Sequence, residues 1–202
     1  MTLLGLDFDN TIVSYDTLFK KLAVEKGLVD NSVAAEKTAI RNHLRSKGED
    51  DLFTLLQGEV YGKQIKEAEP AEGMLETLKT LQKKGIKLTI ISHKTKTPYA
   101  GPNYDLHHAA KCWLEKNGFF SSQGLGMSED QVFLEVSQKE IIARIIQIGC
   151  THFLDDLPKI LYSLPTSIKG ILYDPRNSKT AHELDKISRW KELKNWNEFK
   201  KK

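Results

Sequence analysis

Short apolar runs of strand length alternate with helical patterns along most of this chain. The runs are apolar at nearly every position, as expected for parallel strands covered by helices on both faces. Each helical pattern between them stops at a glycine. The strand candidates are Leu3–Phe8, Lys87–Ile91, Val132–Leu134, Thr151–Leu154 and Gly170–Tyr173. The helix candidates are Ala71–Lys84, Asp105–Asn117 and Ser137–Ile148. This alternation predicts an α/β fold built on a doubly wound parallel sheet.

One long segment, residues 13–69, breaks the alternation because it contains helical patterns and no convincing strand. These patterns cover Thr17–Lys26, Val33–Ser46 and Asp50–Gly62. We therefore expect a core domain of residues 1–12 and 70–202 and a helical cap of residues 13–69. An insertion directly after the first strand would lie over the carboxyl edge of the sheet as a lid. The loop Thr95–Tyr104 also follows a strand and is expected at the same edge.

Composition favours a soluble cytoplasmic protein. The chain has 202 residues, about one domain with a small accessory one, and its 40% apolar content is enough for a packed core. It contains neither an apolar stretch of the roughly 20 residues that cross a membrane nor a signal-peptide pattern at Met1. Cys112 and Cys150 are too few for a disulfide framework and are interpreted as reduced thiols.

The net charge of +3 is confined to the last 20 residues, where seven Lys or Arg accompany four Asp or Glu. The final Lys200-Lys201-Lys202 is interpreted as a frayed end, since nucleic-acid footprints gather more basic residues than this. Neither a nucleic acid nor a membrane is therefore expected as a partner, and the oligomeric state stays open.

The candidate catalytic and ligand-binding residues lie directly after predicted strands or in the first turn of a predicted helix. Asp7 and Asp9, two positions apart, would point to the same side if the strand continued, and both carboxylates then need a partner such as Mg2+. The others are Thr11, Ser92 and its neighbour His93, Lys139, and the pair Asp155-Asp156. A parallel sheet would bring these residues to one edge, where ligands bind in open α/β folds.

This collection meets the needs of phosphoryl transfer. Asp7 would attack phosphorus as a carboxylate, and Asp9 would act as general acid and then as general base. The Mg2+ site would use Asp7, Asp9, Asp155 and Asp156. Phosphate oxygens would be held by Thr11, Ser92, the backbone amide of His93, and Lys139.

Each of these residues also has an ordinary structural interpretation. Paired aspartates can cap helices, a serine can end a strand in a turn, and a lysine is commonly solvated. Further candidates are weaker. Lys94, Lys96 and Tyr99 could contact an anionic substrate at the entrance. His107, His108 and Cys112 share a helix but fall short of a zinc site. Trp190, Trp196 and Phe199 are interpreted as packing residues of a C-terminal helix.

The motifs together resemble the haloacid dehalogenase-like (HAD) hydrolase superfamily. The segment Asp7-Phe8-Asp9-Asn10-Thr11 is similar to its first motif, Ser92 to its second, Lys139 to its third and Asp155-Asp156 to its fourth. The resemblance implies a Rossmann-like sheet, a helical cap after the first motif, Mg2+, and Asp7 as nucleophile. Phosphatases of the superfamily carry an aspartate two residues after the nucleophile, as Asp9 does, and its dehalogenases do not.

One departure concerns the fourth motif, where a further acidic residue often follows. Here Leu157-Pro158-Lys159-Ile160 follows instead, so the adjacent pair must hold the metal. Which of Asp155 and Asp156 does so stays open.

The leading hypothesis is a Mg2+-dependent phosphomonoesterase that acts on a small phosphorylated metabolite, a sugar phosphate or a nucleotide, through an aspartyl-phosphate. The alternatives are a phosphatase for a nucleic-acid end or a phosphoprotein, and a noncatalytic phosphate-binding module. A receiver domain is disfavoured, because it would lack the helical insertion.

Overall fold

The computed structural model describes residues 2–196 and residue 199. Its main sheet has six strands, all parallel, in the order β5-β4-β1-β6-β7-β8. The strands are β1 (Leu3–Leu6), β4 (Lys87–His93), β5 (Val132–Glu135), β6 (His152–Asp155), β7 (Lys169–Tyr173) and β8 (Asp185–Ile187). The predicted doubly wound parallel sheet is therefore confirmed, with β8 as an additional edge strand.

The chain divides into two compact units, which we describe separately. The sheet unit comprises residues 1–13, 70–94 and 118–202, and the helical unit comprises residues 14–69 and 95–117. The helical unit thus contains residues 95–117 in addition to almost all of the segment 13–69 identified in the sequence. Two short strands, β2 (Val13–Ser14) and β3 (Glu69–Pro70), pair where the chain passes from one unit to the other and back.

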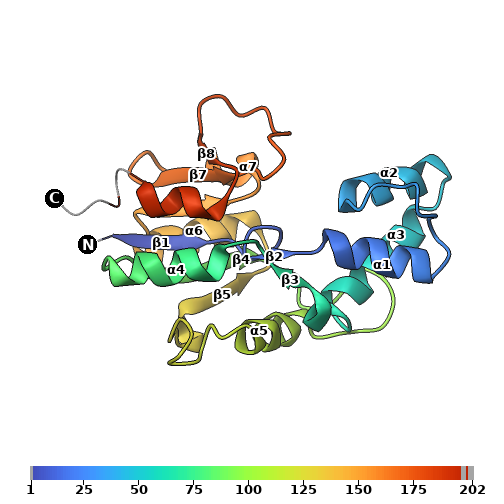
Figure 1. Cartoon of the computed structure of the whole chain (residues 1–202), viewed down its shortest axis with the longest axis horizontal. Coiled ribbons are helices and arrows are strands. Elements are labelled where there is room, and N and C mark those ends of the chain that lie inside the picture. The colour runs from blue at the N-terminus through green and yellow to red at the C-terminus, as the bar shows by residue number, and fades with distance from the viewer. Residues whose placement is uncertain (1, 197–198, 200–202) are drawn as a thin grey trace. The chain divides into compact units, whose positions relative to one another are not determined.

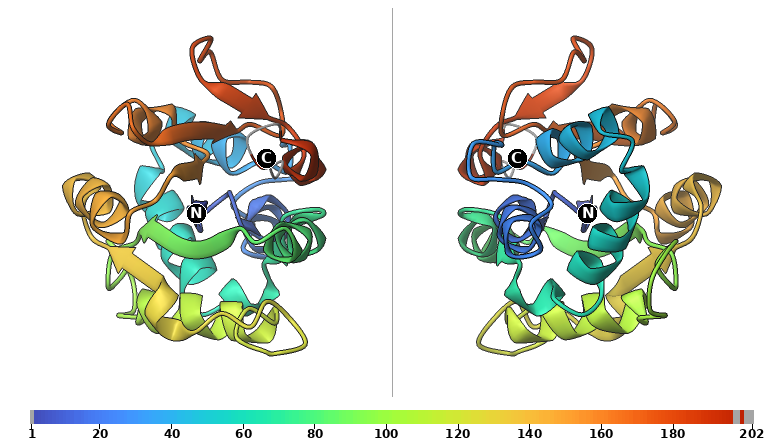
Figure 2. Two further views of the ribbon diagram at one scale, coloured as in Figure 1. Left: turned by 90° about the vertical axis from the view of Figure 1, so that its left-hand side faces the viewer. Right: turned by 90° about the vertical axis from the view of Figure 1, so that its right-hand side faces the viewer.

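Helices cover both faces of the sheet. The helices of this unit are α4 (Met74–Lys83), α6 (Gln138–Ile148) and α7 (Pro158–Leu161), with the 3-10 helices η2 (Glu129–Gln131) and η3 (Trp190–Asn195). Helix α4 and η3 lie on one face, and α6 and α7 lie on the other (Figures 1 and 2). The core on the α6 side is entirely apolar, with Ile141, Ile145, Phe153 and Leu172 at most 2% exposed. The parallel register of the strands, with Leu6 opposite both Ile90 and Leu154, brings the carboxyl ends of β1, β4 and β6 to one edge.

Local sequence signals explain where α6 begins and ends. Ser137 lies at its N-cap, and its hydroxyl accepts a 3.3 Å hydrogen bond from the amide of Glu140. Gly149 follows the last turn with a φ of +76°, in the left-handed region that glycine adopts without strain. The helix predicted from Ser137 is therefore confirmed. It places Lys139 in the first turn, at the carboxyl side of β5.

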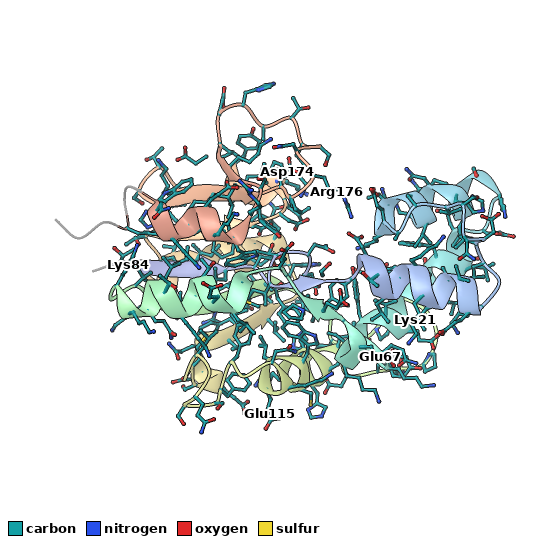
Figure 3. The ribbon with its side chains drawn as sticks, viewed as in Figure 1. Lys21, Glu67, Lys84, Glu115, Asp174 and Arg176 are labelled. Atoms are coloured by element: carbon teal, nitrogen blue, oxygen red, sulfur yellow. The ribbon has the colours of Figure 1, made fainter. Side chains whose placement is uncertain are left out.

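The helical unit contains α1 (Asp16–Glu25), α2 (Lys37–Ser46), α3 (Asp50–Tyr61), η1 (Ile65–Glu67) and α5 (Leu106–Lys116). The three predicted helices of the insertion are thus present, although α2 begins at Lys37, four residues after the predicted start at Val33. Helix α5 packs against α3 and η1, and the indole of Trp113, 1% exposed, donates a 2.8 Å hydrogen bond to the carbonyl of Ala68. A surface ion pair of 2.7 Å joins Lys21 to Glu67 (Figure 3). The two segments of this unit therefore share one core.

The C-terminal aromatic residues pack into the sheet unit. Trp190 and Phe199 are at most 2% exposed, which confirms their interpretation as packing residues, whereas Trp196 is only partly buried. The helix they were expected to belong to is the short 3-10 helix η3. The prediction for Lys200–Lys202 lies outside the described residues. No described helix has the length and apolar character needed to cross a membrane.

Candidate active site

Asp7 is the first residue after β1, and the structure buries it to 7% exposure. Two hydroxyl groups donate hydrogen bonds to its carboxylate. The Ser92 hydroxyl lies 2.7 Å from Oδ1, and the Thr11 hydroxyl lies 3.1 Å from Oδ2. Ser92 is on the neighbouring strand β4, and Thr11 is in the loop that follows Asp7. Each carboxylate oxygen is therefore oriented by a separate element.

The loop after Asp7 turns tightly. The amides of Ile12 and Val13 both donate 3.1 Å hydrogen bonds to the carbonyl of Phe8. Asn10 has a φ of +60°, in the left-handed region where asparagine is among the better tolerated residues. This turn ends the strand geometry at once, so that Asp7 and Asp9 have different surroundings although they lie two residues apart.

Trp190 supports the same loop from the C-terminal segment. Its indole donates a 3.3 Å hydrogen bond to the carbonyl of Thr11, and its ring lies 5.9 Å from that of Tyr173. The sequence offered no signal for this contact, because the two residues are far apart in the chain.

Asp7, Asp155 and Asp156 form an acidic cluster, in which one carboxylate oxygen from each lies within 4.8 Å of the others. Burial raises the pKa of Asp7 well above its usual value, and the charges of Asp155, Asp156 and Asp9 raise it further. Burial and the charge of Asp156 raise the pKa of Asp155 to about 8. The amide of Leu157 donates a 2.7 Å hydrogen bond to Asp155 and opposes this shift only in part.

The donor chemistry of this cluster fits a hard divalent cation. Carboxylate oxygens are the ligands that Mg2+ prefers. A cation would offset the mutual repulsion that, in addition to burial, raises the pKa values of Asp7 and Asp155. Both Asp155 and Asp156 belong to the cluster. Among residues 2–196 and 199, it is the one such group of three or more potential ligands.

Asp9 lies outside this cluster and is paired with Lys94. The sequence analysis expected this lysine at the entrance of the site. The ammonium of Lys94 lies 2.9 Å from each carboxylate oxygen of Asp9 and 5.4 Å from the centre of the Phe8 ring. The Lys94 side chain is 2% exposed, so it is buried at the site rather than at an entrance. Lys96 and Tyr99, its predicted companions, are exposed residues of the helical unit.

Lys139 and His93 lie at the exposed margin of the sheet's carboxyl edge. Lys139 is exposed, and its ammonium has no ion-pair partner within the described part of the chain. The His93 ring nitrogen Nε2 lies 3.0 Å from the carbonyl oxygen of Val136. In this structure, neither side chain is bonded to the aspartates.

A different lysine contacts the acidic cluster itself, from the loop after β7. The ammonium of Lys179 lies 3.3 Å from Oδ2 of Asp156 and also donates to the Asp156 carbonyl. Asp174, 1% exposed, holds this loop by accepting hydrogen bonds from the amides of Ser178 and Lys179 at 3.2 and 2.9 Å (Figure 3). Sequence reasoning missed Asp174, although it follows an apolar strand directly, as Asp7 and Asp155 do.

The weaker zinc candidate stays incomplete. His108 and Cys112 are exposed on α5, with Nε2 and Sγ 3.4 Å apart, but His107 does not join them in a metal-binding group within the described residues.

Comparison with known proteins finds similarity in structure. No protein-family model matches the chain, and no curated protein sequence matches it.

YfnB of Bacillus subtilis, a HAD hydrolase bound to magnesium, has a TM-score of 0.61 at 15% identity, with 96% of this chain and 97% of that chain covered. A haloacid dehalogenase-like hydrolase from Burkholderia xenovorans has a TM-score of 0.57 at 13% identity, with 98% and 97% covered. A HAD-superfamily hydrolase from Ehrlichia chaffeensis has a TM-score of 0.54 at 14% identity, with 96% of each chain covered. A dehalogenase also matches. The chain therefore has the α/β fold of the haloacid dehalogenase-like hydrolases.

Proposed function

We propose that this protein is a Mg2+-dependent phosphomonoester hydrolase that acts on a small phosphorylated metabolite, a sugar phosphate or a nucleotide. One observation carries the proposal. The carboxylate of Asp7 is held by two hydroxyl groups beside two further carboxylates, and Asp9 lies two residues on. The fold shared with known HAD hydrolases supports an enzyme with this site.

Mg2+ would be held by Asp7, Asp155 and Asp156. When bound, it would offset the charge of the phosphoryl group and of the three carboxylates. Magnesium bound to YfnB supports this choice of ion. Asp9, which the sequence analysis also assigned to the metal, has its carboxylate paired with Lys94, and we therefore assign its side chain to proton transfer alone.

The chain's own residues would carry out two displacements. A carboxylate oxygen of Asp7 attacks phosphorus, the ester P–O bond breaks, and the leaving oxygen takes a proton from Asp9. In the second step Asp9 takes a proton from water and the water oxygen attacks phosphorus. The bond between phosphorus and the Asp7 oxygen breaks, which restores the Asp7 carboxylate and releases inorganic phosphate. The hydrogen bonds from Ser92 and Thr11 would hold Asp7 in line for both steps.

Phosphate oxygens need donors besides the metal. The Ser92 hydroxyl and the backbone amides after it are candidates, and the His93 amide is one of them. Lys139 at the start of α6 is the cation that the family resemblance assigns to this task. The helical unit would provide contacts to the rest of the substrate, and such a unit favours small molecules over phosphoproteins or nucleic-acid ends.

Dehalogenation is the second candidate activity, because a dehalogenase is among the matched structures. Asp9 argues against it. Dehalogenases of the superfamily lack an aspartate at this position, and a halide leaving group needs no proton. We also propose a cytoplasmic location, which is supported by Cys112 and Cys150, since both are free thiols.

The test is phosphate release from a panel of sugar phosphates, nucleotides, a phosphopeptide and a 5′-phosphorylated oligonucleotide, with Mg2+ and with EDTA. We expect Mg2+-dependent turnover of one small-molecule class, and its loss in Asp7→Asn. Turnover of the phosphopeptide or the oligonucleotide alone would indicate that the substrate is a phosphoprotein or a nucleic-acid end instead. Phosphate binding without any turnover would indicate a noncatalytic module, and halide release from haloacids would indicate a dehalogenase.

A further inference from the structure

Lys94 is a buried cation whose position is set by three different contacts. Its amide donates a 2.8 Å hydrogen bond to the carbonyl of Glu135 on β5. Its ammonium lies 5.4 Å from the centre of the Phe8 ring and at the same 2.9 Å distance from both oxygens of Asp9. Burying an ammonium group is costly unless it is paired. Lys94 is therefore built into the site.

Lys94 and Ser92 lie close together near the carboxyl end of β4, and each contacts one of the two aspartates after β1. Ser92 lies in β4, and Lys94 is the first residue after this strand, where its amide still bonds to Glu135 of β5. Ser92 contacts Asp7, and Lys94 contacts Asp9, with the same separation of 85 residues along the chain. Lys94 thus lies beside Asp9, the proposed proton donor, and two residues after the serine that contacts the proposed nucleophile.

The negative charge at the site must be offset by a cation when a phosphate group binds. A phosphate monoester dianion would approach a site that already contains four aspartates, and Mg2+ offsets only part of this charge. Lys179 is engaged with Asp156, and Lys139 is exposed without an ion-pair partner among the described residues. Lys94 presents a desolvated ammonium, which interacts with an anion more strongly than a solvated one does.

We propose that Lys94 is a phosphate-binding residue of this site, and that its pairing with Asp9 is the arrangement adopted without substrate. When a phosphoryl group enters, the ammonium turns part of its hydrogen bonding from the Asp9 carboxylate to a phosphoryl oxygen. Asp9, no longer held as an ion-paired carboxylate, can then take up a proton from solvent and give it to the leaving oxygen. This inference rests on the proposed function for its substrate class, but it can be tested by phosphate binding alone.

The experiment measures binding of inorganic phosphate to the full chain in the presence of Mg2+ by isothermal titration calorimetry. Lys94→Met keeps much of the side-chain volume and removes the charge. We expect about tenfold weaker binding or more, the size of one lost charge-assisted hydrogen bond. Lys87→Met is the matched control, because Lys87 is an exposed residue at the opposite end of the same strand, and its phosphate affinity should equal that of the unaltered protein.

Lys94→Met leaves the Asp9 carboxylate without this partner, so it can fail to fold. Asp9→Asn and the double variant Asp9→Asn/Lys94→Met then provide the comparison. The double variant removes both charges of the pair, and Asp9→Asn keeps an amide oxygen that can accept a hydrogen bond from the Lys94 ammonium. Asp9→Asn frees the ammonium from a competing carboxylate and should bind phosphate several-fold more tightly than the unaltered protein. Adding Lys94→Met should abolish that gain.

The outcomes separate this inference from the proposed hydrolysis. Phosphate binding that is lost with Lys94, in a protein that hydrolyses nothing, would refute the hydrolase and support the inference. Equal binding by Asp9→Asn and the double variant would overturn the inference. The inference would also be overturned if Lys139→Met lost phosphate binding while Lys94→Met bound phosphate normally. The phosphate-binding cation would then be Lys139.

Discussion

The hydroxyl of Ser92 donates a 2.7 Å hydrogen bond to Oδ1 of Asp7, although 85 residues separate the two in the chain. The contact exists because β4 lies parallel to β1 in the sheet, with Leu6 opposite Ile90. It joins the ends of two adjacent strands at the proposed nucleophile. The orientation of Asp7 therefore depends on the strand register as well as on the loop that follows β1.

Asp7→Asn should abolish hydrolysis and keep the fold. The substitution nearly conserves volume but removes the nucleophile and one charge of the acidic cluster. Loss of the covalent route should raise the barrier by at least about 4 kcal/mol, roughly a thousandfold in rate. Turnover of the purified variant, with its circular dichroism spectrum as the folding control, checks this. Near-normal turnover would exclude Asp7 as the nucleophile.

Asp9→Asn should slow both steps, because the same group acts first as acid and then as base. With an activated aryl phosphate the leaving group needs little protonation, so the second step should become limiting and the phosphoenzyme should accumulate. Intact-mass measurement after rapid quenching should find one added phosphoryl group, which is absent in the Asp7→Asn/Asp9→Asn control. Normal steady-state turnover of Asp9→Asn would contradict the assignment.

Without metal, the stability of the protein should fall as pH rises because of the acidic cluster. Burial raises the pKa of Asp155 from its ordinary 3.8 to about 8, so the folded state holds a proton that the unfolded state releases. The stabilisation from this group is complete below about pH 4 and is lost as pH rises to about 8, and Asp7 shifts in the same direction.

Mg2+ competes with that proton, so it should raise the melting temperature more at pH 8 than at pH 6. Melting curves with Mg2+ and with EDTA at both pH values measure the difference. Asp155→Asn is the comparison variant and should show a smaller dependence on both pH and Mg2+. An equal Mg2+ shift at both pH values would argue against a metal at these carboxylates.

Gly5→Ala should destabilise the sheet unit. A Cβ at Gly5 would lie 2.6 Å from Cδ2 of Phe153 and 3.0 Å from Sγ of Cys150, so the core must shift to admit it. Overpacking of this kind costs about 1–3 kcal/mol of unfolding free energy. Gly170→Ala is the matched control on β7, because its Cβ would meet Leu161 at 3.3 Å. Urea unfolding should give a clearly smaller loss for the control.

Removal of the helical unit should require both of its segments. Replacing residues 16–68 alone would uncover Trp113 and the face of α5 that packs on α3 and η1, and we expect that variant to aggregate. Replacing residues 16–68 and 95–117 by short Gly/Ser linkers should leave a folded domain that Mg2+ still stabilises. Selectivity among metabolites should be lost while an activated aryl phosphate is still hydrolysed. Unchanged selectivity would mean that the sheet unit itself determines substrate choice.

The fold was largely predictable because its strands and helices carry strong local signals. The run before Asp7, the capping residue Ser137 and the glycines that end helices all lie within a few residues of what they determine. β8 was missed because Asp185-Lys186-Ile187 is a short edge strand with little apolar content. Its pairing with β7 depends on tertiary structure rather than on the segment itself.

The positions of the aspartates in the site could be predicted from the sequence, and the positions of the lysines could be predicted less well. Asp7 follows β1, Asp155 ends β6 and Asp156 comes next, so their meeting at one edge follows from the parallel sheet. A lysine side chain is long, and nothing in the sequence around Lys94 indicates that its ammonium would be buried against Phe8 and Asp9. Lys179 depends on the loop held by Asp174, which no local pattern describes.

The strand order has a consequence for synthesis on the ribosome. β1 is translated first, yet both of its neighbours, β4 and β6, are translated only after the whole of residues 14–69. Helices α1 to α3 can begin to associate while Leu3–Leu6 still has two unpaired edges. A ribosome that stalls before β4 would therefore hold a nascent chain whose strand β1 can pair with other molecules, and a chaperone that covers this strand would protect the chain.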